Sequence, residues 1–460
     1  MRQAGGYSRR GSAFDRDWTK GSIIRNLVML SWPIIISQSL NMMGPTIDMI
    51  WVGRLGAVPI AAVGVAGMVV MLVMAAMMGL AWGARAMIAR FVGAGDAEGA
   101  NHVAGQAFVL SAGVTVVLVS IGIFFAEPIL NLMGVAADVV AEGVPYMRIM
   151  FVGSMFMVFR MMVESIMQAS GDAVTPMKIA VLFRAIHLVV CPFLVLGWWI
   201  FPSLGVSGAA LANVFSQSLG LGLGLWVLVS GRTRLRLDFS NFSLDLDIIW
   251  RIVKIGVPAC VMGMQRGLGQ LVLMWFIVPF GTLAVAAHTL CQRVEMLMVM
   301  IGMGVGMAAG VLAGQNLGAG QPERAERSGW LAVGFAEGIL VIFSLAILLS
   351  AENIVSIFNT EPALVEIASS FLRIAAVGFF VLGFIVVFML FLSGVGDTVP
   401  AMFFEMVPTW GVMLPLVFFL PRVTDLGVYG IRWAIVANMA VGAAVYLAYF
   451  ALGRWKRKRV

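Results

Sequence analysis

Apolar residues in this chain come in long blocks and not in the 3.6-residue stripe of an amphipathic helix. A helix of about 20 apolar residues, at 1.5 Å rise per residue, crosses a hydrocarbon layer of about 30 Å. A membrane barrel would instead show strands of about ten residues with alternating polarity. The pattern therefore predicts an all-α integral membrane protein with twelve transmembrane helices, over residues 24–52, 59–89, 103–126, 144–169, 177–201, 204–230, 248–279, 283–314, 327–350, 363–393, 399–420 and 427–453.

The connections between these blocks differ in charge. Arginine and lysine gather in the N-terminal segment 1–23, in the connection 231–247 and in the tail 454–460. The connections on the other side hold few of them and carry acids such as Glu127 and Glu352. Because basic connections stay on the cytoplasmic side, both termini are expected in the cytoplasm, in agreement with an even number of crossings.

The two halves of the chain repeat each other. Features of the first half recur 225 residues later: Pro33, Gly56 and Gly171-Asp172 return as Pro258, Gly281 and Gly396-Asp397. Six helices in each half give both halves the same orientation, so the repeats are parallel and related by an axis along the membrane normal. The predicted organisation is a cytoplasmic N-terminal segment 1–23, an N-terminal six-helix lobe 24–230, a cytoplasmic linker 231–247, a C-terminal six-helix lobe 248–453 and a basic cytoplasmic tail 454–460.

Composition narrows the class of protein further. Residues are 61 % hydrophobic and only 12 % charged, which excludes a soluble enzyme, a nucleic-acid-binding protein and a secreted disulfide scaffold. The net charge of +7 is accounted for by the basic connections. Cysteines lie in apolar runs without metal-ligand spacing, so they are interpreted as packing residues and no metal site is expected. The chain has no Walker motif, so ATP is not expected to drive it directly.

Several stretches match a known family in order and spacing. They are SWPIIISQSLNMMGPTIDMIWVGRLG (31–56), FVGAGD (91–96), ASGDAVTPM (169–177), LGVSGAALAN (204–213), AAHTLCQRVEMLMVMIGMGVGMAAGVLAGQNLGAG (286–320) and LSGVGDTVPAM (392–402). Over nearly its whole length the chain resembles the multidrug and toxic compound extrusion (MATE) family of cation-coupled antiporters, in a prokaryotic version. The resemblance implies two six-helix lobes forming a V around a central cavity. It also implies export of amphipathic, often cationic, organic compounds driven by inward H⁺ or Na⁺.

The resemblance carries expectations about partners and location. We expect a multi-pass protein of the bacterial cytoplasmic (inner) membrane that meets a small organic substrate and the lipid bilayer, but no nucleic acid. It is expected to work as a monomer, without a cofactor other than the coupling ion. An alternative is a related flippase for lipid-linked precursors, although such proteins usually have more than twelve crossings. An intramembrane enzyme is not expected, because the three histidines are scattered along the chain.

Asp48 is the first candidate for ion coupling. Its counterpart in the second half is Leu273, so the charge is not needed merely to build a lobe. Gly44 and Pro45 precede it, and Pro45 has no N–H for the carbonyl of Asn41, which predicts a helix break with a free carbonyl near the acid. Broken helices with carboxylates and loose carbonyls form ion sites in transporters. Asp48 also matches the family's first-helix aspartate; the alternatives are a structural acid or a pair with Arg54.

A second candidate group lies on the predicted helix 177–201. Arg184, His187 and Cys191 are spaced i, i+3 and i+7, on one helical face. Many relatives have Asn and Asp at the last two positions, and replacing those oxygens by imidazole and thiol disfavours Na⁺ and favours H⁺. His187 either takes part in a proton relay or is a buried neutral histidine bonded to a neighbour. Gln38 and Asn41 are expected nearby on the first helix, lining the cavity or compensating charge.

Other charges within the apolar blocks need partners. Glu164 and Arg184 lie at similar depth and are expected to pair, with a role for Glu164 in proton transfer as the alternative. In the second lobe Arg266 is expected to pair with Glu295, or else to line the cavity. His288, Gln292 and Glu295 share one face of the helix 283–314. The family's second-lobe cation site is expected to be absent, since its positions hold Arg266 and Leu382 here.

Overall fold

The computed structural model describes residues 16–199, 202–235, 237 and 243–458, and within these every regular element is a helix. The described α-helices are α1 (Ile23–Met42), α2 (Gly44–Val52), α3 (Ala57–Gly93), α4 (Ala97–Leu132), α5 (Ala137–Ala169), α6 (Val174–Leu196), α7 (Gly205–Val229), α8 (Leu246–Ile277), α9 (Thr282–Gly318), α10 (Pro322–Ser356), α11 (Pro362–Phe379), α12 (Leu382–Gly394), α13 (Thr398–Pro408), α14 (Leu414–Val423) and α15 (Val428–Leu452). The predicted all-α fold is confirmed.

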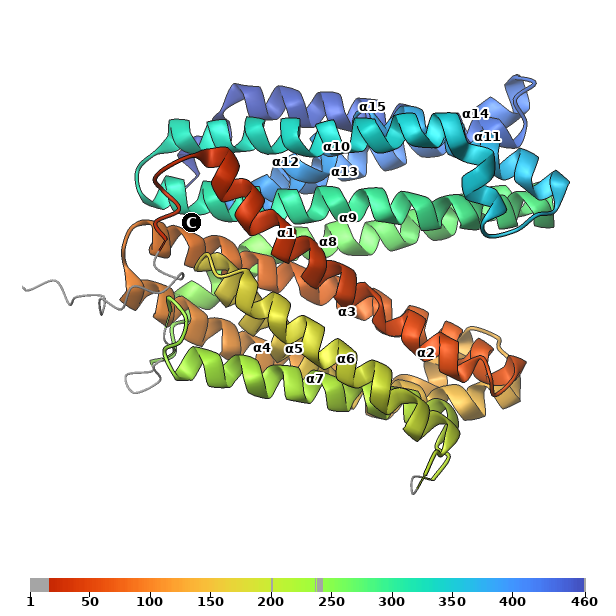
Figure 1. Cartoon of the computed structure of the whole chain (residues 1–460), viewed down its shortest axis with the longest axis horizontal. Coiled ribbons are helices and arrows are strands. Elements are labelled where there is room, and N and C mark those ends of the chain that lie inside the picture. Colours follow the sequence, from red (N-terminus) through yellow and green to blue (C-terminus); the bar gives the residue numbers. More distant parts are fainter. Residues whose placement is uncertain (1–15, 200–201, 236, 238–242, 459–460) are drawn as a thin grey trace, which may run out of the picture.

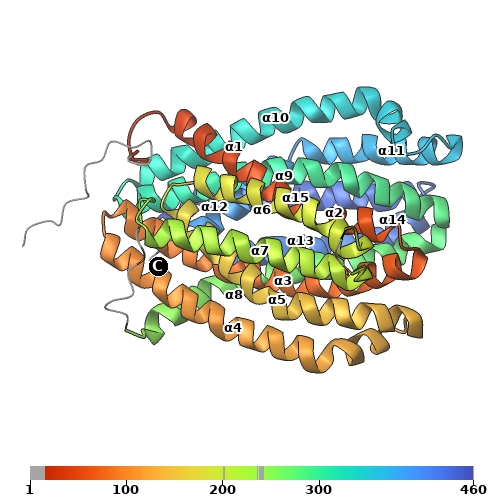
Figure 2. The same cartoon turned by 60° about the horizontal axis from the view of Figure 1, so that its bottom comes forward.

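The helices form two bundles that lie side by side in Figure 1 and overlap one another in the turned view of Figure 2. The first bundle holds α1–α7 and the second α8–α15. Three crossings are each built from two helices: α1 with α2, α11 with α12, and α13 with α14, the last joined by a π turn at Thr409–Met413. With these pairs counted once, the described helices make the twelve crossings that the sequence predicts.

The repeat is visible in the bounds of the helices. α9 begins and ends 225 residues after α3 (282 against 57, 318 against 93), and α11 with α12 spans the same interval from α5 (362 against 137, 394 against 169). The glycines that precede α3 and α9, Gly56 and Gly281, both have left-handed φ angles of 124° and 94°. Residues with a β-carbon rarely adopt such angles, so the same tight entry is built in both halves.

The two bundles meet at the end of the molecule that carries the C-terminus (Figure 1). There α3 packs along α8 and α9 with backbones almost in contact. A β-carbon on Gly93 would lie 2.0 Å from the Gln315 carbonyl oxygen, and one on Gly318 would lie 2.0 Å from that of Arg90. Arg90 also donates to the Val395 carbonyl at 3.0 Å. The recorded contacts between bundles therefore concentrate at one end, and the helices diverge toward the other.

Helix α1 joins the two bundles. Its first part packs on α9 and α10 of the second bundle, and its later part packs on α6 of the first (Figure 1). A β-carbon on Gly304 of α9 would lie 2.1 Å from the Ile35 side chain, which shows how closely α1 crosses α9. Because α1 contacts both bundles, a movement of one bundle against the other must shift or bend α1.

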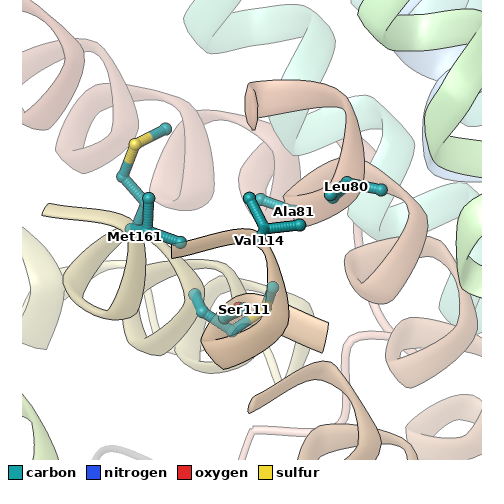
Figure 3. Close-up of a pocket in the computed structure, with 7 residues that line it drawn as sticks. Leu80, Ala81, Ser111, Val114 and Met161 are labelled. Carbon is teal, nitrogen blue, oxygen red and sulfur yellow. The ribbon is translucent and has the colours of Figure 1, made fainter. Parts of the chain in front are cut away.

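The pockets recorded in the described part of the chain are small. The pocket in Figure 3 lies between α3, α4 and α5, where Leu80, Ala81, Val114 and Met161 surround the single hydroxyl of Ser111. It has room for about one water molecule and too few polar groups to hold one firmly. This pocket is a packing defect of the first bundle and not a substrate site.

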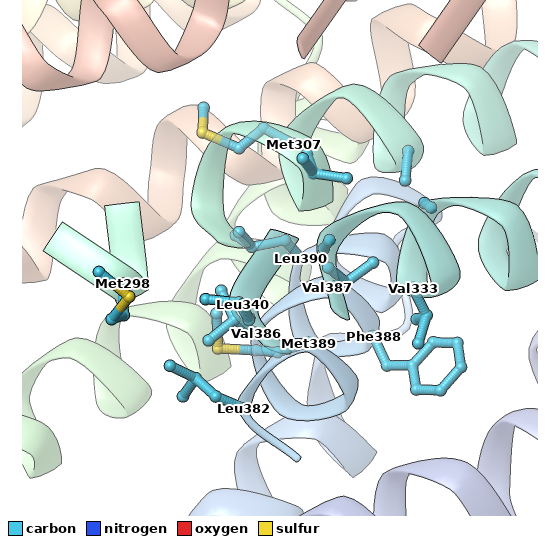
Figure 4. Close-up of a cluster of buried hydrophobic side chains, with 14 of the residues drawn as sticks. Met298, Met307, Val333, Leu340, Leu382, Val386, Val387, Phe388, Met389 and Leu390 are labelled. Carbon is cyan, nitrogen blue, oxygen red and sulfur yellow. The ribbon is translucent and has the colours of Figure 1, made fainter. Parts of the chain in front are cut away.

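Each bundle has its own apolar core. In the second bundle the core gathers around α12, whose Leu382, Val386 and Phe388 pack against Val333 and Leu340 of α10 (Figure 4). Methionines of α9 complete it, with Met298 and Met307 both more than nine-tenths buried. Since no water competes in a bilayer, such packing holds helices together through close van der Waals contact.

Candidate functional site

The first helix is broken where the candidate acid lies. α1 ends at Met42 and α2 begins at Gly44, so the structure has the break at the position that the sequence predicts. Pro45 leaves the Asn41 carbonyl without an amide partner in the helix. That carbonyl is not free, contrary to expectation, because Nη2 of Arg184 donates to it at 3.2 Å. Gly44 makes this approach possible, since a β-carbon there would lie 2.7 Å from Arg184 Nη1.

Asp48 lies one turn beyond the break and is completely buried. Its Oδ1 is 3.0 Å from Nε2 of His187, a close contact whose N–H direction is off the line of an ideal hydrogen bond. The Cys191 thiol donates to the same oxygen at 3.8 Å. Oδ2 of Asp48 is buried and has no hydrogen-bond partner. The alternative pair with Arg54 is not formed, because that guanidinium stacks over the Trp51 ring at 4.6 Å.

Arg184 determines which nitrogen of His187 carries the proton. Nη1 of Arg184 is 3.0 Å from Nδ1 of the imidazole. A guanidinium only donates hydrogen bonds, so Nδ1 is the acceptor and the proton of the neutral ring is on Nε2, which faces Asp48. A doubly protonated ring would set an N–H of His187 against an N–H of Arg184. In the neutral ring the Nε2–H therefore lies on the Asp48 side, although the pair lacks the geometry of a full hydrogen bond.

Asp48, His187 and Cys191 also resemble a metal-ligand set. One ligand atom from each lies within 4.8 Å of the other two, and all three residues are buried. Imidazole, thiolate and carboxylate together suit a transition metal. A cation in this position would, however, have the Arg184 guanidinium on the other side of the same imidazole. The cluster is electrostatically better suited to a proton than to a metal ion.

A second network begins at Asn41. Its Oδ1 accepts from Arg160 at 3.1 Å, and its Nδ2 lies 3.4 Å from both Glu164 Oε2 and Gln38 Oε1. Arg160 and Glu164 pair at 3.0 Å, and Gln168 donates to the other carboxylate oxygen at 3.0 Å. Asn41 thus connects this ion pair to Arg184, through its side chain on one side and its carbonyl on the other.

The predicted pair of Glu164 with Arg184 is wrong. Arg160, one turn before Glu164 on α5, takes the carboxylate because the two residues are neighbours on one helical face. Arg184 is occupied by the Asn41 carbonyl and by His187. Depth along two helices identified groups that share a layer, but the helical rotation of α6 aims Arg184 toward α1 and not toward α5.

The predicted pair of Arg266 with Glu295 is also wrong. Arg266 on α8 pairs with Glu405 on α13. Glu295 on α9 faces α15 and pairs with Arg432, which also donates to Nδ1 of His288 from 3.2 Å. Gln292, which was expected on one face with His288 and Glu295, has a different partner: it donates to Gln270 on α8 at 2.6 Å. Glu164, Arg266 and Glu295 each have an ion-pair partner, which comes from another helix than the sequence suggested. Arg184 is held by neutral groups instead.

Three charged residues of the second bundle were missed in the sequence. Glu405 and Arg432 supply the partners just described, and Glu337 lies inside the apolar block of α10. The comparison that singled out Asp48 could have found all of them. By the 225-residue interval the repeat counterparts of Glu405 and Glu337 are Ala180 and Ala112. Near the end of each half LGVSG (204–208) matches LGVYG (426–430) at an interval of 222, which makes Ala210 the counterpart of Arg432.

Comparison with known proteins accounts for both halves of the chain. The family model MatE matches residues 33–193 and again residues 258–419, so each bundle carries one copy of the same unit. The chain belongs to the MatE family. Since members of this family are transporters, this chain is a multi-pass membrane transporter and not an enzyme.

Two relatives align with nearly the whole MatE chain. The Bacillus subtilis (strain 168) protein named "Probable multidrug resistance protein YoeA" is 27 % identical over 450 residues, which are 96 % of each chain. A Shewanella oneidensis protein named "FAD transporter" is 26 % identical over 425 residues, 92 % of this chain and 93 % of its own. The similarity to multidrug resistance proteins supports a role in drug efflux.

The fold has a solved counterpart. A structure described as the outward-facing conformation of a multidrug resistance MATE family transporter of the MOP superfamily superposes with a TM-score of 0.88. It is 25 % identical and covers 95 % of this chain and 96 % of its own. This likeness confirms the two-lobed fold, and the two bundles are called the N-terminal and C-terminal lobes from here on.

Proposed function

We propose that this transporter exports small amphipathic organic compounds in exchange for inward-moving H⁺, with Asp48 as the proton-binding group. The observation that carries the proposal is the buried Asp48 carboxylate, which has one unpartnered oxygen and a neutral imidazole on the other. An isolated charge is costly inside a membrane, so this carboxyl has a strong reason to bind a proton.

His187 has a defined part in this proposal. Because Arg184 occupies Nδ1, the imidazole gives its Nε2 proton to the contact with Asp48 and takes up none itself. The incoming proton binds at Oδ2 of Asp48, which has no other partner. Neutralising the carboxylate then weakens the contact with His187 and frees α2 to reorient at the break after α1.

The same geometry relates proton binding to movement of the lobes. Arg184 binds both His187 and the Asn41 carbonyl at the break, so a change at Asp48 is transmitted to the helix that crosses between lobes. α1 packs on α9 and α10 of the C-terminal lobe before it reaches α6. The proposed cycle is rigid-body rocking of two pseudo-symmetric lobes, in which protonated Asp48 accompanies release of the exported compound.

Protons are favoured over Na⁺ by the atoms around Asp48. Sodium takes several hard oxygen ligands, and the neighbours of Asp48 are an imidazole nitrogen and a thiol. The Arg184 guanidinium adds a fixed positive charge on the far side of the imidazole. A proton needs one free oxygen and tolerates all three neighbours.

Orientation and location are part of the proposal. The basic N-terminal segment, the linker and the tail support cytoplasmic termini in the bacterial cytoplasmic membrane. In that orientation the lobes touch at their cytoplasmic ends and diverge outward. The conformation is then outward-facing, and it is the state in which Asp48 takes its proton from outside. We propose that a single chain carries out the whole cycle.

We infer the substrate class from the names of the relatives and from the ion pair that neutralises Arg266 in the C-terminal lobe. Arg266 is paired with Glu405, which offsets the positive charge that an organic cation would meet there. Relatives named as multidrug resistance proteins support varied organic compounds, and the one named as an FAD transporter supports a bulky organic anion as the second class. Ethidium, a permanent cation, therefore serves as the first probe.

The test is ethidium export from proteoliposomes, with a pH gradient and a Na⁺ gradient imposed separately. We expect transport by wild type under the pH gradient alone, and its loss in Asp48→Asn. Asp138→Asn, which removes an exposed acid at the start of α5, is the matched control and should transport normally. Transport driven by Na⁺ alone, or full activity of Asp48→Asn under the pH gradient, would overturn the proposal.

A further inference from the structure

Glu337 is a buried carboxylate in the C-terminal lobe that the exchange mechanism above does not use. Both of its side-chain oxygens are buried and lack a side-chain partner. The other acids within the helices of this lobe that lie beneath the surface are paired, Glu295 with Arg432 and Glu405 with Arg266. The repeat counterpart of Glu337 is Ala112, so the acid is not required to build the lobe.

The carboxylate lies against the second helix break of the molecule. α11 ends at Phe379 and α12 begins at Leu382, with Val381 outside helical geometry at ψ 0°. A β-carbon on Gly383 would lie 2.0 Å from Oε2 of Glu337, so a larger residue at this position would push the carboxylate aside. The backbone N–H of Gly383 faces the carboxylate without the geometry of a full hydrogen bond.

The surroundings of Glu337 are apolar. Val333 and Leu340 lie one turn before and after it on α10, and Leu382 and Val386 of α12 pack into the same core (Figure 4). The helices packed on α10 are α9, α11, α12 and α1. Their charged and titratable residues, with those of α10 itself, are His288, Cys291, Arg293 and Glu295 on α9, Glu366 and Arg373 on α11, Arg25 on α1, and Glu323, Arg324, Glu326, Arg327 and Glu352 on α10.

None of the recorded ion pairs or hydrogen bonds of those residues reaches Glu337. His288 and Glu295 are bound to Arg432, Glu352 to Arg373, and Glu326 to Lys456. An ionised carboxylate without a cation or a full set of donors is strongly disfavoured in such a medium, by several kcal/mol. Around Glu337 the protein therefore stabilises the neutral acid as long as the α11–α12 break is packed as it is here.

We propose that Glu337 is a second proton-binding site of this transporter, in the C-terminal lobe, which releases its proton when the α11–α12 break rearranges and exposes the carboxylate to water. The proposal rests on the proposed proton antiport and gives each lobe one acid at a helix break. In the N-terminal lobe Asp48 follows the break at Met43, and in the C-terminal lobe Glu337 covers the break at Val381. Two protons then enter for each compound exported.

The first arm of the test needs no substrate. Infrared difference spectra of reconstituted protein between acid and alkaline buffer show the carbonyl stretch of each carboxylic acid that titrates. We expect Glu337→Gln to remove one buried-acid band that wild type and Asp48→Asn both retain, and Gly383→Ala to shift that band. Glu352→Gln, on the same helix but at its exposed end, is the matched control and should retain it.

The second arm measures protons carried per ethidium in proteoliposomes. Loss of one of two sites should lower this ratio by about half in Glu337→Gln, whereas Glu352→Gln should leave it unchanged. An unaltered infrared spectrum of Glu337→Gln would overturn the inference. So would a lost band with an unchanged ratio of protons to ethidium. If wild type moved no ethidium under a pH gradient, the proposed antiport would fail, while the infrared arm would still decide whether Glu337 binds a proton.

Discussion

Arg184 donates a hydrogen bond to Nδ1 of His187 from one turn earlier on α6, with 3.0 Å between the two nitrogens. The contact makes the imidazole a donor of one proton toward Asp48 and prevents it from holding two. A histidine is often assigned as a proton carrier because it titrates near neutral pH. At this site the contact with Arg184 disfavours a second proton on His187. The Asp48 carboxylate is then the group that changes charge.

Replacing His187 tests this division of roles. Glutamine can donate to Asp48 and accept from Arg184, as the neutral imidazole does, whereas alanine can do neither. We expect His187→Gln to keep pH-driven ethidium export within about threefold of wild type. We expect His187→Ala to lower it at least about tenfold, because it removes the buried hydrogen bond from the Arg184 guanidinium, and such a bond to a charged group contributes about 1.5–3 kcal/mol. Equal losses in both variants would show that His187 itself carries the proton.

Removing Arg160 should destabilise the N-terminal lobe. Arg160→Met leaves the Glu164 carboxylate buried without its cation, which costs about 3–5 kcal/mol. The measurement is the midpoint of thermal unfolding in detergent. Arg148→Met is the matched control. Arg148 is on the same helix but is half exposed, and its contact with Glu127 is long, at 4.0 Å. The two variants unfolding at the same temperature would contradict the prediction.

The contact between lobes should depend on its glycines. Gly318→Ala places a methyl group 2.0 Å from the Arg90 carbonyl oxygen, and a backbone atom cannot move aside as a flexible side chain does. We expect the lobes to separate at this end, as a longer pulsed-EPR distance between spin labels at the exposed positions Glu98 and Glu323. Gly64→Ala is the control, because no neighbour lies within 4 Å of its added methyl group. The same label distance in both variants would refute the idea.

Asp172, in the connection between α5 and α6, should make stability depend on pH. Burial raises the pKa of its carboxyl, although the hydrogen bonds from Thr175 act in the opposite direction. The folded protein thus prefers the neutral acid, and this contribution to stability is complete at low pH and lost as the pH rises through the raised pKa. Asp172→Asn should therefore unfold at a higher temperature than wild type at neutral pH, and the advantage should vanish in acid.

The control for that comparison is Asp96→Asn. Asp96 accepts from the Gly99 amide at the start of α4, as Asp172 accepts from Thr175 at the start of α6, but it is exposed to solvent. Its replacement measures the effect of changing a cap at an exposed site, against which the effect of Asp172→Asn is compared at each pH. An advantage of Asp172→Asn that persists in acid would show that the buried charge is not its cause.

Much of the fold could be predicted from the sequence because a bilayer admits so few solutions. Apolar blocks of membrane-spanning length must be helices. The interval of 225 residues between Pro33 and Pro258 recurs between the other matched residues, and this constancy indicates duplicated units. The grouping of Arg184, His187 and Cys191 on one face follows from helical periodicity alone. These inferences need only distances along one helix.

Contacts between helices could not be predicted in the same way. Glu164 and Arg184 do lie at a similar depth, but pairing also depends on how far each helix is rotated about its axis. Arg432 was overlooked because it stands alone in an apolar block, and with it the partner of Glu295. Glu337 was overlooked for the same reason, although its repeat counterpart Ala112 marks it as an addition to the lobe.

The glycine contacts that join the lobes at one end also set how far the other end travels. α3 has 37 residues, so it is about 55 Å long, and a rotation of about 10° around its contact with Gln315 moves its far end by about 10 Å. The two lobes can thus rotate about one shared contact, which lies at one end of the molecule. Small displacements near Gly93 and Gly318 become large ones at the opposite rim, where a compound must enter or leave.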